Sequence, residues 1–137
     1  MSFNTSFAQD NTADSIFDNT SDDQFLVKFP LRTTSLSPAE FKSFQNPAAL
    51  TGSTVEKPIC VIGHDPLSIR WLNTHKNKLI DADAVCFVVN IETKALFDQM
   101  QSIAPNLKIA AISADWLNKY YGLTHYPALI TTDWVSQ

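Results

Sequence analysis

Four short runs between residues 58 and 131 are continuous and mainly apolar rather than alternating. Uninterrupted runs of this length indicate strands that are buried on both faces of a sheet. The predicted strands cover residues 58–63, 84–89, 107–112 and 128–131. Between these runs, apolar residues recur at helical spacing. This spacing predicts helices over residues 66–80, 93–103 and 114–121.

Capping residues at the ends of these segments support the predicted helices. Asp65 followed by Pro66 is typical of a helix start, because Asp caps free N–H groups and Pro fits the first turn. Gly122 is a typical residue after a helix end. The alternation predicts an α/β fold of order βαβαβαβ, with a further strand possible at 134–137. Its sheet is expected to be mainly parallel, with helices on both faces.

The first half of the chain has a different composition. Residues 1–24 carry five acidic residues and no Lys or Arg, whereas the rest carries ten basic and nine acidic residues. We therefore predict a flexible acidic leader over 1–24, an extended arm and loop over 25–56, and a folded domain over 57–137. Ser6-Phe7-Ala8 is similar to the end of an export signal, although small residues also occur there by chance.

Composition excludes several classes of function. The net charge of −4 and an isoelectric point near 5.1 argue against a generally basic nucleic-acid binder. No apolar run reaches 18 residues, so no integral membrane segment is predicted.

The three histidines, His64, His75 and His125, have no spacing typical of a metal site. The turn at residues 63–68 is not a nucleotide-binding loop, and no cofactor is expected.

The segment from Asn118 to Thr131 resembles part of the thioredoxin-like fold. There, a short helix ends in Tyr-Gly-aliphatic and a cis proline opens the next strand; here Tyr121-Gly122-Leu123 and Pro127 occupy those places. The resemblance implies a cis bond before Pro127. It also implies a groove between that proline and the start of the helix after the central strand.

A narrower resemblance covers roughly residues 26–137. Its motifs are Phe29-Pro30-Leu31-Arg32-Thr33, Gly63-His64-Asp65-Pro66, Val88-Val89-Asn90 and His125-Tyr126-Pro127-Ala128-Leu129-Ile130-Thr131. They resemble an uncharacterised family encoded in bacterial integrating conjugative elements, beside genes for a type IV secretion apparatus. This resemblance implies a non-catalytic accessory subunit that binds other protein subunits of the apparatus. It also implies a periplasmic location, with the cytoplasm as the alternative.

The predicted binding residues line the groove that the resemblance implies. They are His125, Tyr126 and Pro127 on one side, Asn90, Ile91, Glu92 and Thr93 opposite, and Tyr121 from the aromatic-rich end. A redox-active thioredoxin needs Cys-x-x-Cys where the central strand meets its helix. Asn90–Thr93 occupies that place and holds no thiol. No catalytic residue is therefore assigned.

The two cysteines, Cys60 and Cys86, are expected to be free and buried. In the strand order that the resemblance implies, residues 107–112 lie between the two cysteine-bearing strands. The cysteines would then be roughly 9–10 Å apart, whereas a disulfide needs Cα atoms within about 7 Å.

Two other functions remain open at this point. One is a small periplasmic enzyme, such as a hydrolase, with its site at His64, Asp65 and His125, because such positions lie near the carboxyl ends of strands. The other is a redox-inactive thioredoxin-like chaperone that binds substrate proteins without exchanging electrons.

Overall fold

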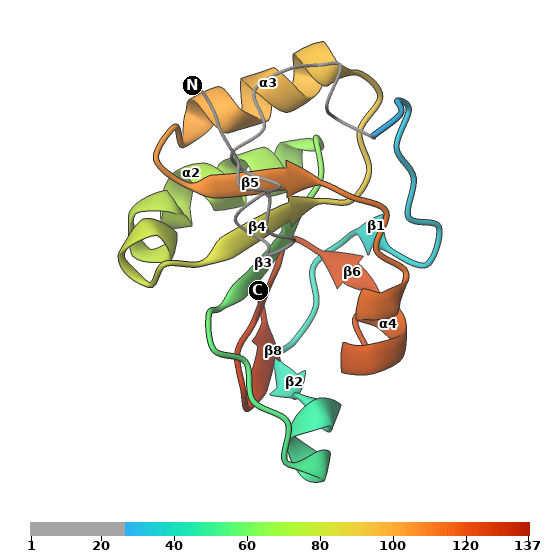
Figure 1. Cartoon of the computed structure of the whole chain (residues 1–137), viewed down its shortest axis with the longest axis vertical. Helices are drawn as coiled ribbons and strands as arrows, with labels where there is room; N and C mark the ends of the chain where they lie inside the picture. The colour runs from blue at the N-terminus through green and yellow to red at the C-terminus, as the bar shows by residue number, and fades with distance from the viewer. Residues whose placement is uncertain (1–26) are drawn as a thin grey trace, which may run out of the picture.

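The computed structural model describes residues 27–137, so the predicted leader over 1–24 lies outside the described residues. Figure 1 shows a twisted sheet with helices packed against it. The strands are β1 (Ser37–Pro38), β2 (Phe44–Gln45), β3 (Ile59–Ile62), β4 (Val85–Val88), β5 (Lys108–Ala111), β6 (His125–Tyr126), β7 (Ala128–Ile130) and β8 (Trp134–Ser136). The helices are η2 (Pro47–Thr51, a 3-10 helix), α2 (Pro66–Asp81), α3 (Lys94–Ile103) and α4 (Trp116–Tyr121).

The predicted fold class is wrong, because the main sheet is mixed rather than mainly parallel. Its six strands follow the order β2-β8-β7-β3-β4-β5. Only β3–β4 and β4–β5 are parallel, whereas β3–β7, β7–β8 and β2–β8 are antiparallel. The antiparallel half consists of short strands from both ends of the described chain. A thioredoxin-like βαβαβαβ arrangement is therefore not what this chain forms.

The strand order also differs from the one expected. β4 lies between β3 and β5, so each helical crossover returns the chain to the neighbouring position. The apolar runs that predict these strands are alike in composition, and they carry no information about which run pairs with which. The strand positions were therefore predictable, but their order and direction were not.

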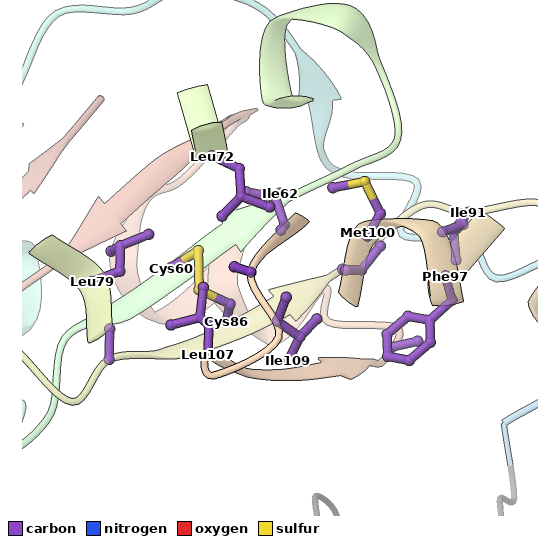
Figure 2. Close-up of a cluster of buried hydrophobic side chains, with 14 of the residues drawn as sticks. Cys60, Ile62, Leu72, Leu79, Cys86, Ile91, Phe97, Met100, Leu107 and Ile109 are labelled. Atoms are coloured by element: carbon purple, nitrogen blue, oxygen red, sulfur yellow. A yellow bond between two sulfur atoms is a disulfide. The ribbon is translucent and has the colours of Figure 1, made fainter. Parts of the chain in front are cut away.

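The prediction of two free cysteines is wrong for the same reason. β3 pairs directly with β4, and Cys60 is the register partner of Cys86. Their Cα atoms are 4.3 Å apart, and the two residues form a disulfide. Both are completely buried among side chains of α2, β5 and the preceding loop, and Figure 2 shows the sulfur–sulfur bond between Leu79, Leu107 and Ile109. The disulfide thus joins β3, which is followed by α2, to β4, which is followed by α3.

Two apolar cores lie on opposite faces of the sheet. Helices α2 and α3 cover one face, where Leu72 and Met100 belong to the same core cluster as the disulfide. Helix α4 and part of the arm cover the other face, where Leu117 packs with Val61 and Ile130. Because successive side chains of a strand point to opposite faces, Val61 contributes to one core while its neighbours contribute to the other.

Residues 27–56 are fixed to the rest of the domain. Leu31 and Ile91 exchange two backbone hydrogen bonds of 2.8 and 3.0 Å. Strand β1 pairs with β6, and β2 extends the main sheet beside β8. The side chain of Asn46, which is completely buried, bonds the backbone of Ala48 and Thr131. The arm and residues 57–137 therefore form one folded unit.

Candidate functional site

An open cleft of about 280 Å³ lies where the arm meets the ends of β3 and β4. It is lined by Arg32, His64, Asp65, Asn90, Ile91, Glu92, Leu96 and Tyr126. The loops after two neighbouring parallel strands supply most of these residues. Such a crevice at the carboxyl ends of strands is where sites form in sheets with parallel strands.

The loop after β3 is held by a compact hydrogen-bond network. The Asp65 carboxylate caps α2, with Oδ2 accepting from the Ser68 backbone N–H at 2.9 Å and Oδ1 from the Ser68 hydroxyl at 2.7 Å. The Ser68 hydroxyl in turn accepts from the backbone N–H of Gly63 at 3.1 Å. Ser68 is completely buried, so its hydroxyl is a structural group rather than an exposed nucleophile.

Asn90, in the loop after β4, anchors the arm to the cleft. Its Oδ1 accepts from the Thr33 backbone N–H at 2.8 Å. Its Nδ2 donates to the carbonyls of Thr33 and Leu36 and, at 3.1 Å, to the Tyr126 hydroxyl. This one amide therefore joins three segments that are far apart in the sequence.

Replacing Asn90 should loosen the arm. We expect Asn90→Ala to lower the free energy of unfolding by about 2 kcal/mol, because several part-buried backbone groups lose their partner at once. Asn73→Ala is the control, since that exposed side chain makes one bond within α2 and its loss should change stability by less than about 0.5 kcal/mol. Urea unfolding of both variants measures this, and equal losses would contradict the anchoring role of Asn90.

Tyr126 forms one wall of the cleft and is only 4% exposed. The Tyr126–Pro127 peptide bond is cis, the isomer expected from the sequence. The backbone around it is already paired, because the N–H of Ala39 donates to the Tyr126 carbonyl at 3.1 Å. The Tyr126 ring lies so close to Gly63 that a Cβ on that glycine would be 2.5 Å from its Cε1. Only glycine allows this packing.

The pKa of Tyr126 is raised above its usual value near 10, mainly because burial disfavours the phenolate. The Asn90 bond lowers this pKa, the charge of Asp65 raises it and that of Arg32 lowers it. In the folded state Tyr126 therefore keeps its proton at a pH at which the unfolded chain has lost it.

Stability should consequently depend on this phenol at high pH. The folded state binds more protons than the unfolded state above about pH 10, so the contribution of Tyr126 is complete below that pH. It is lost as pH rises from 10 through the folded pKa. We expect the stability difference between the wild type and Tyr126→Phe to shrink between pH 8 and pH 11 in urea unfolding. A difference that is constant over this range would contradict the raised pKa.

An ion pair closes the cleft on the side of the arm. The Arg32 guanidinium contacts the Glu92 carboxylate and also donates to its neighbouring carbonyl, that of Leu31, at 3.2 Å. Both charged side chains are about half exposed, so the pair contributes little to stability. Its position beside the Leu31–Ile91 backbone pairing places two opposite charges at the rim.

The structure brings together four of the predicted binding residues. Asn90, Ile91, Glu92 and Tyr126 all line the cleft. Thr93 lies beside it, where its hydroxyl caps α3 by accepting from Leu96 N–H at 3.2 Å.

The other predicted binding residues lie elsewhere. His125 faces away from the cleft lining, with its Nδ1 3.2 Å from the Ser37 hydroxyl. Pro127 does not line the cleft, and its carbonyl accepts from the Gln137 side chain. Tyr121 is the last residue of α4; it is buried in the core, and its ring packs edge-on against Tyr120. These three residues were expected at one groove on the basis of a thioredoxin-like strand arrangement. This chain does not form that arrangement, so the prediction is wrong for them.

Sequence reasoning did not assign Arg32 and Leu96 to the site. Arg32 is 60 residues from its partner Glu92, and it reaches the cleft because Leu31 pairs with Ile91. The motif Phe29–Thr33 was the only sequence signal that included Arg32. Leu96 is one of the apolar positions of α3, and its partial exposure at the cleft had no separate signal.

The residues of the enzymatic alternative do not share the cleft. His64 and Asp65 line it, whereas His125 does not. Within residues 27–137, no group of three or more His, Cys, Asp or Glu side chains could hold a metal ion. Over the same residues, no helix has both the length and the apolarity needed to cross a membrane.

Comparisons with known proteins identify one family. A family model described as "Protein of unknown function (DUF2859)" matches residues 4–135. Neither the search of curated proteins nor that of solved structures gave a significant match. Because the match covers nearly the whole sequence, the chain belongs to the DUF2859 family of proteins of unknown function.

Proposed function

We propose that this protein is a non-catalytic accessory subunit of a conjugative type IV secretion apparatus, and that it binds other subunits through the cleft. The binding role is supported by the polar groups that line the cleft, because most of them are already engaged in hydrogen bonds or an ion pair within the protein. Asp65 and Asn90 are committed to holding the loops and the arm, and Arg32 is paired with Glu92. What the cleft offers is a shaped surface with a partly apolar wall. The conjugative setting rests on the sequence resemblance over residues 26–137.

A binding role also fits better than catalysis on chemical grounds. A nucleophile needs a base within hydrogen-bond reach, and that base needs an orienting group. Ser68 beside the cleft is completely buried and bonded to Asp65 and Gly63. Within the described residues, the side chain of His64 makes no hydrogen bond that would orient it as a base. The alternative enzyme would need a rearrangement of these loops.

The disulfide supports export of the protein to an oxidising compartment such as the periplasm. Structural disulfides form and persist there, whereas cytosolic reductants keep thiols reduced. Cys60 and Cys86 are completely buried, so this disulfide is a structural one rather than an exchangeable one. We expect osmotic shock to release the native protein. Mass spectrometry without reduction should then show the peptides that contain Cys60 and Cys86 linked to each other. Recovery from the cytoplasm with two free thiols would contradict export.

A transfer assay tests the proposed role. Deletion of the gene should abolish conjugative transfer, and the wild-type gene should restore it. Glu92→Lys removes the partner of Arg32 and leaves two neighbouring cations at the cleft, so it should restore transfer at least about tenfold less well, because these unpaired charges must lose hydration when a partner covers them. Asp98→Lys is the matched control, because Asp98 has a similar exposure and also pairs with a cation, but lies outside the cleft.

Two results of this assay would overturn the proposal. Normal transfer after deletion would exclude the accessory role. Equal complementation by Glu92→Lys and Asp98→Lys, at equal protein levels, would exclude the cleft as the binding surface.

A further inference from the structure

We propose that the cleft takes an uncharged aliphatic residue of an extended partner peptide, whose backbone carbonyl accepts a hydrogen bond from the Tyr126 hydroxyl. This inference rests on the proposed binding function and names the chemistry that the cleft selects. Three features of the cleft support it: a hydrogen-bond donor without an acceptor, charges that are already paired, and an aliphatic wall.

The Tyr126 hydroxyl has an unused donor. A phenol both donates and accepts, and this one accepts from Asn90 Nδ2 at 3.1 Å. Among the described residues no acceptor receives its proton. Tyr126 is only 4% exposed, and it lines the cleft together with Arg32, Asp65 and Asn90. This donor is therefore available to an acceptor that enters the cleft.

The acceptor should be uncharged, because the cleft's own charges are already balanced. Arg32 and Glu92 neutralise each other. The Asp65 carboxylate accepts two hydrogen bonds from Ser68 and lies at the N-terminus of α2, whose dipole offsets its charge. An added cation or anion would therefore lose hydration without gaining an unpaired counter-charge. An amide carbonyl meets the requirement.

The remaining wall is aliphatic. Leu96, in the first turn of α3, is partly exposed, and the buried Ile91 also lines the cleft. The volume of about 280 Å³ is slightly below the roughly 300–1,000 Å³ of small-molecule sites. The cleft therefore suits one side chain and its flanking peptide groups rather than a cofactor.

Blocked single residues test this ligand class directly. The probes are N-acetyl-leucine N-methylamide and the corresponding glycine, lysine and glutamate compounds, titrated into the ¹⁵N-labelled full chain. We expect saturable shifts of the Ile91 and Glu92 amides and of the Asn90 side-chain amide with the leucine probe. Binding of the other three probes should be at least about fivefold weaker. Equal binding of the glycine probe, or tighter binding of a charged probe, would overturn the proposal.

Paired variants separate the contacts from general effects on folding. Tyr126→Phe keeps the ring and removes only the hydroxyl, so it should weaken the leucine probe about fivefold, as loss of one hydrogen bond does. Tyr120→Phe is the control, because that exposed hydroxyl bonds Ser53 outside the cleft. Leu96→Ala should likewise weaken binding, whereas Leu50→Ala, at a residue 78% exposed elsewhere, should not. Equal affinity within either pair would overturn the assigned contact.

The failure of this inference can be told apart from failure of the proposed function. If no leucine probe binds while Glu92→Lys still impairs transfer, the ligand class is wrong and the binding role stands. If the Glu92→Lys variant also supports normal transfer, both the ligand class and the proposed binding role are wrong.

Discussion

Reducing the Cys60–Cys86 disulfide should lower the free energy of unfolding by about 3.5 kcal/mol at 25 °C. The two cysteines are 26 residues apart in sequence, and closing a loop of that length removes this much entropy from the unfolded chain. The loop contains α2, so reduction frees the whole crossover between β3 and β4. Few single changes elsewhere in a small domain are expected to cost as much.

The measurement compares urea unfolding of oxidised and reduced protein. Because the disulfide is completely buried, reduction should be carried out on the unfolded chain before refolding in dithiothreitol. A Cys60→Ala/Cys86→Ala variant is the control, since its unfolding should not respond to the reductant. An unchanged midpoint and slope in protein that mass spectrometry shows to be fully reduced would contradict this role of the disulfide.

Gly63→Ala should lower the free energy of unfolding by about 3 kcal/mol and displace Tyr126 from the cleft. A Cβ at this position would be 2.5 Å from Cε1 and 3.0 Å from Cζ of the Tyr126 ring. The Tyr126 hydroxyl accepts a hydrogen bond from Asn90 Nδ2 at 3.1 Å, so a displaced ring would strain or lose that bond. Overpacking of this kind typically costs about 1–3 kcal/mol, and the lost bond adds to it.

Gly52→Ala is the matched control for this prediction. A Cβ on Gly52 meets nothing within 4 Å, and only its φ of +81° is unfavourable for alanine. Its cost should be about 1 kcal/mol. Urea unfolding gives the stability change, and the Tyr126 ring resonances report its position. Equal costs for the two variants, with unchanged Tyr126 resonances, would contradict the close packing.

Apolar periodicity predicted the elements better than their arrangement. The helix expected over 66–80 is α2 at Pro66–Asp81, with Asp65 as its cap, because cap chemistry is local. The strand expected over 84–89 is β4 at Val85–Val88. Direction and order depend on which strand the chain returns to, and the composition of the runs does not encode this. The antiparallel half of the sheet and the disulfide were therefore both missed.

The site shows the same division between local and distant information. Asn90, Glu92 and Tyr126 were placed together correctly, since they lie at the ends of predicted elements. Arg32 reaches them through a backbone pairing with Ile91 that no local pattern indicates. His125 was assigned with Tyr126, but neighbouring residues in an extended segment point to opposite sides, and His125 faces Ser37 instead.

Photo-crosslinking from the cleft in donor cells tests most directly whether the protein binds the secretion apparatus through this surface. A benzoylphenylalanine in place of Glu92 should form an adduct in the periplasm that contains a subunit of the conjugative secretion apparatus. The same group in place of Asp98, which is similarly exposed on α3 but lies outside the cleft, should not form it. The same adducts from both positions, or none with a subunit of the apparatus, would contradict binding through the cleft.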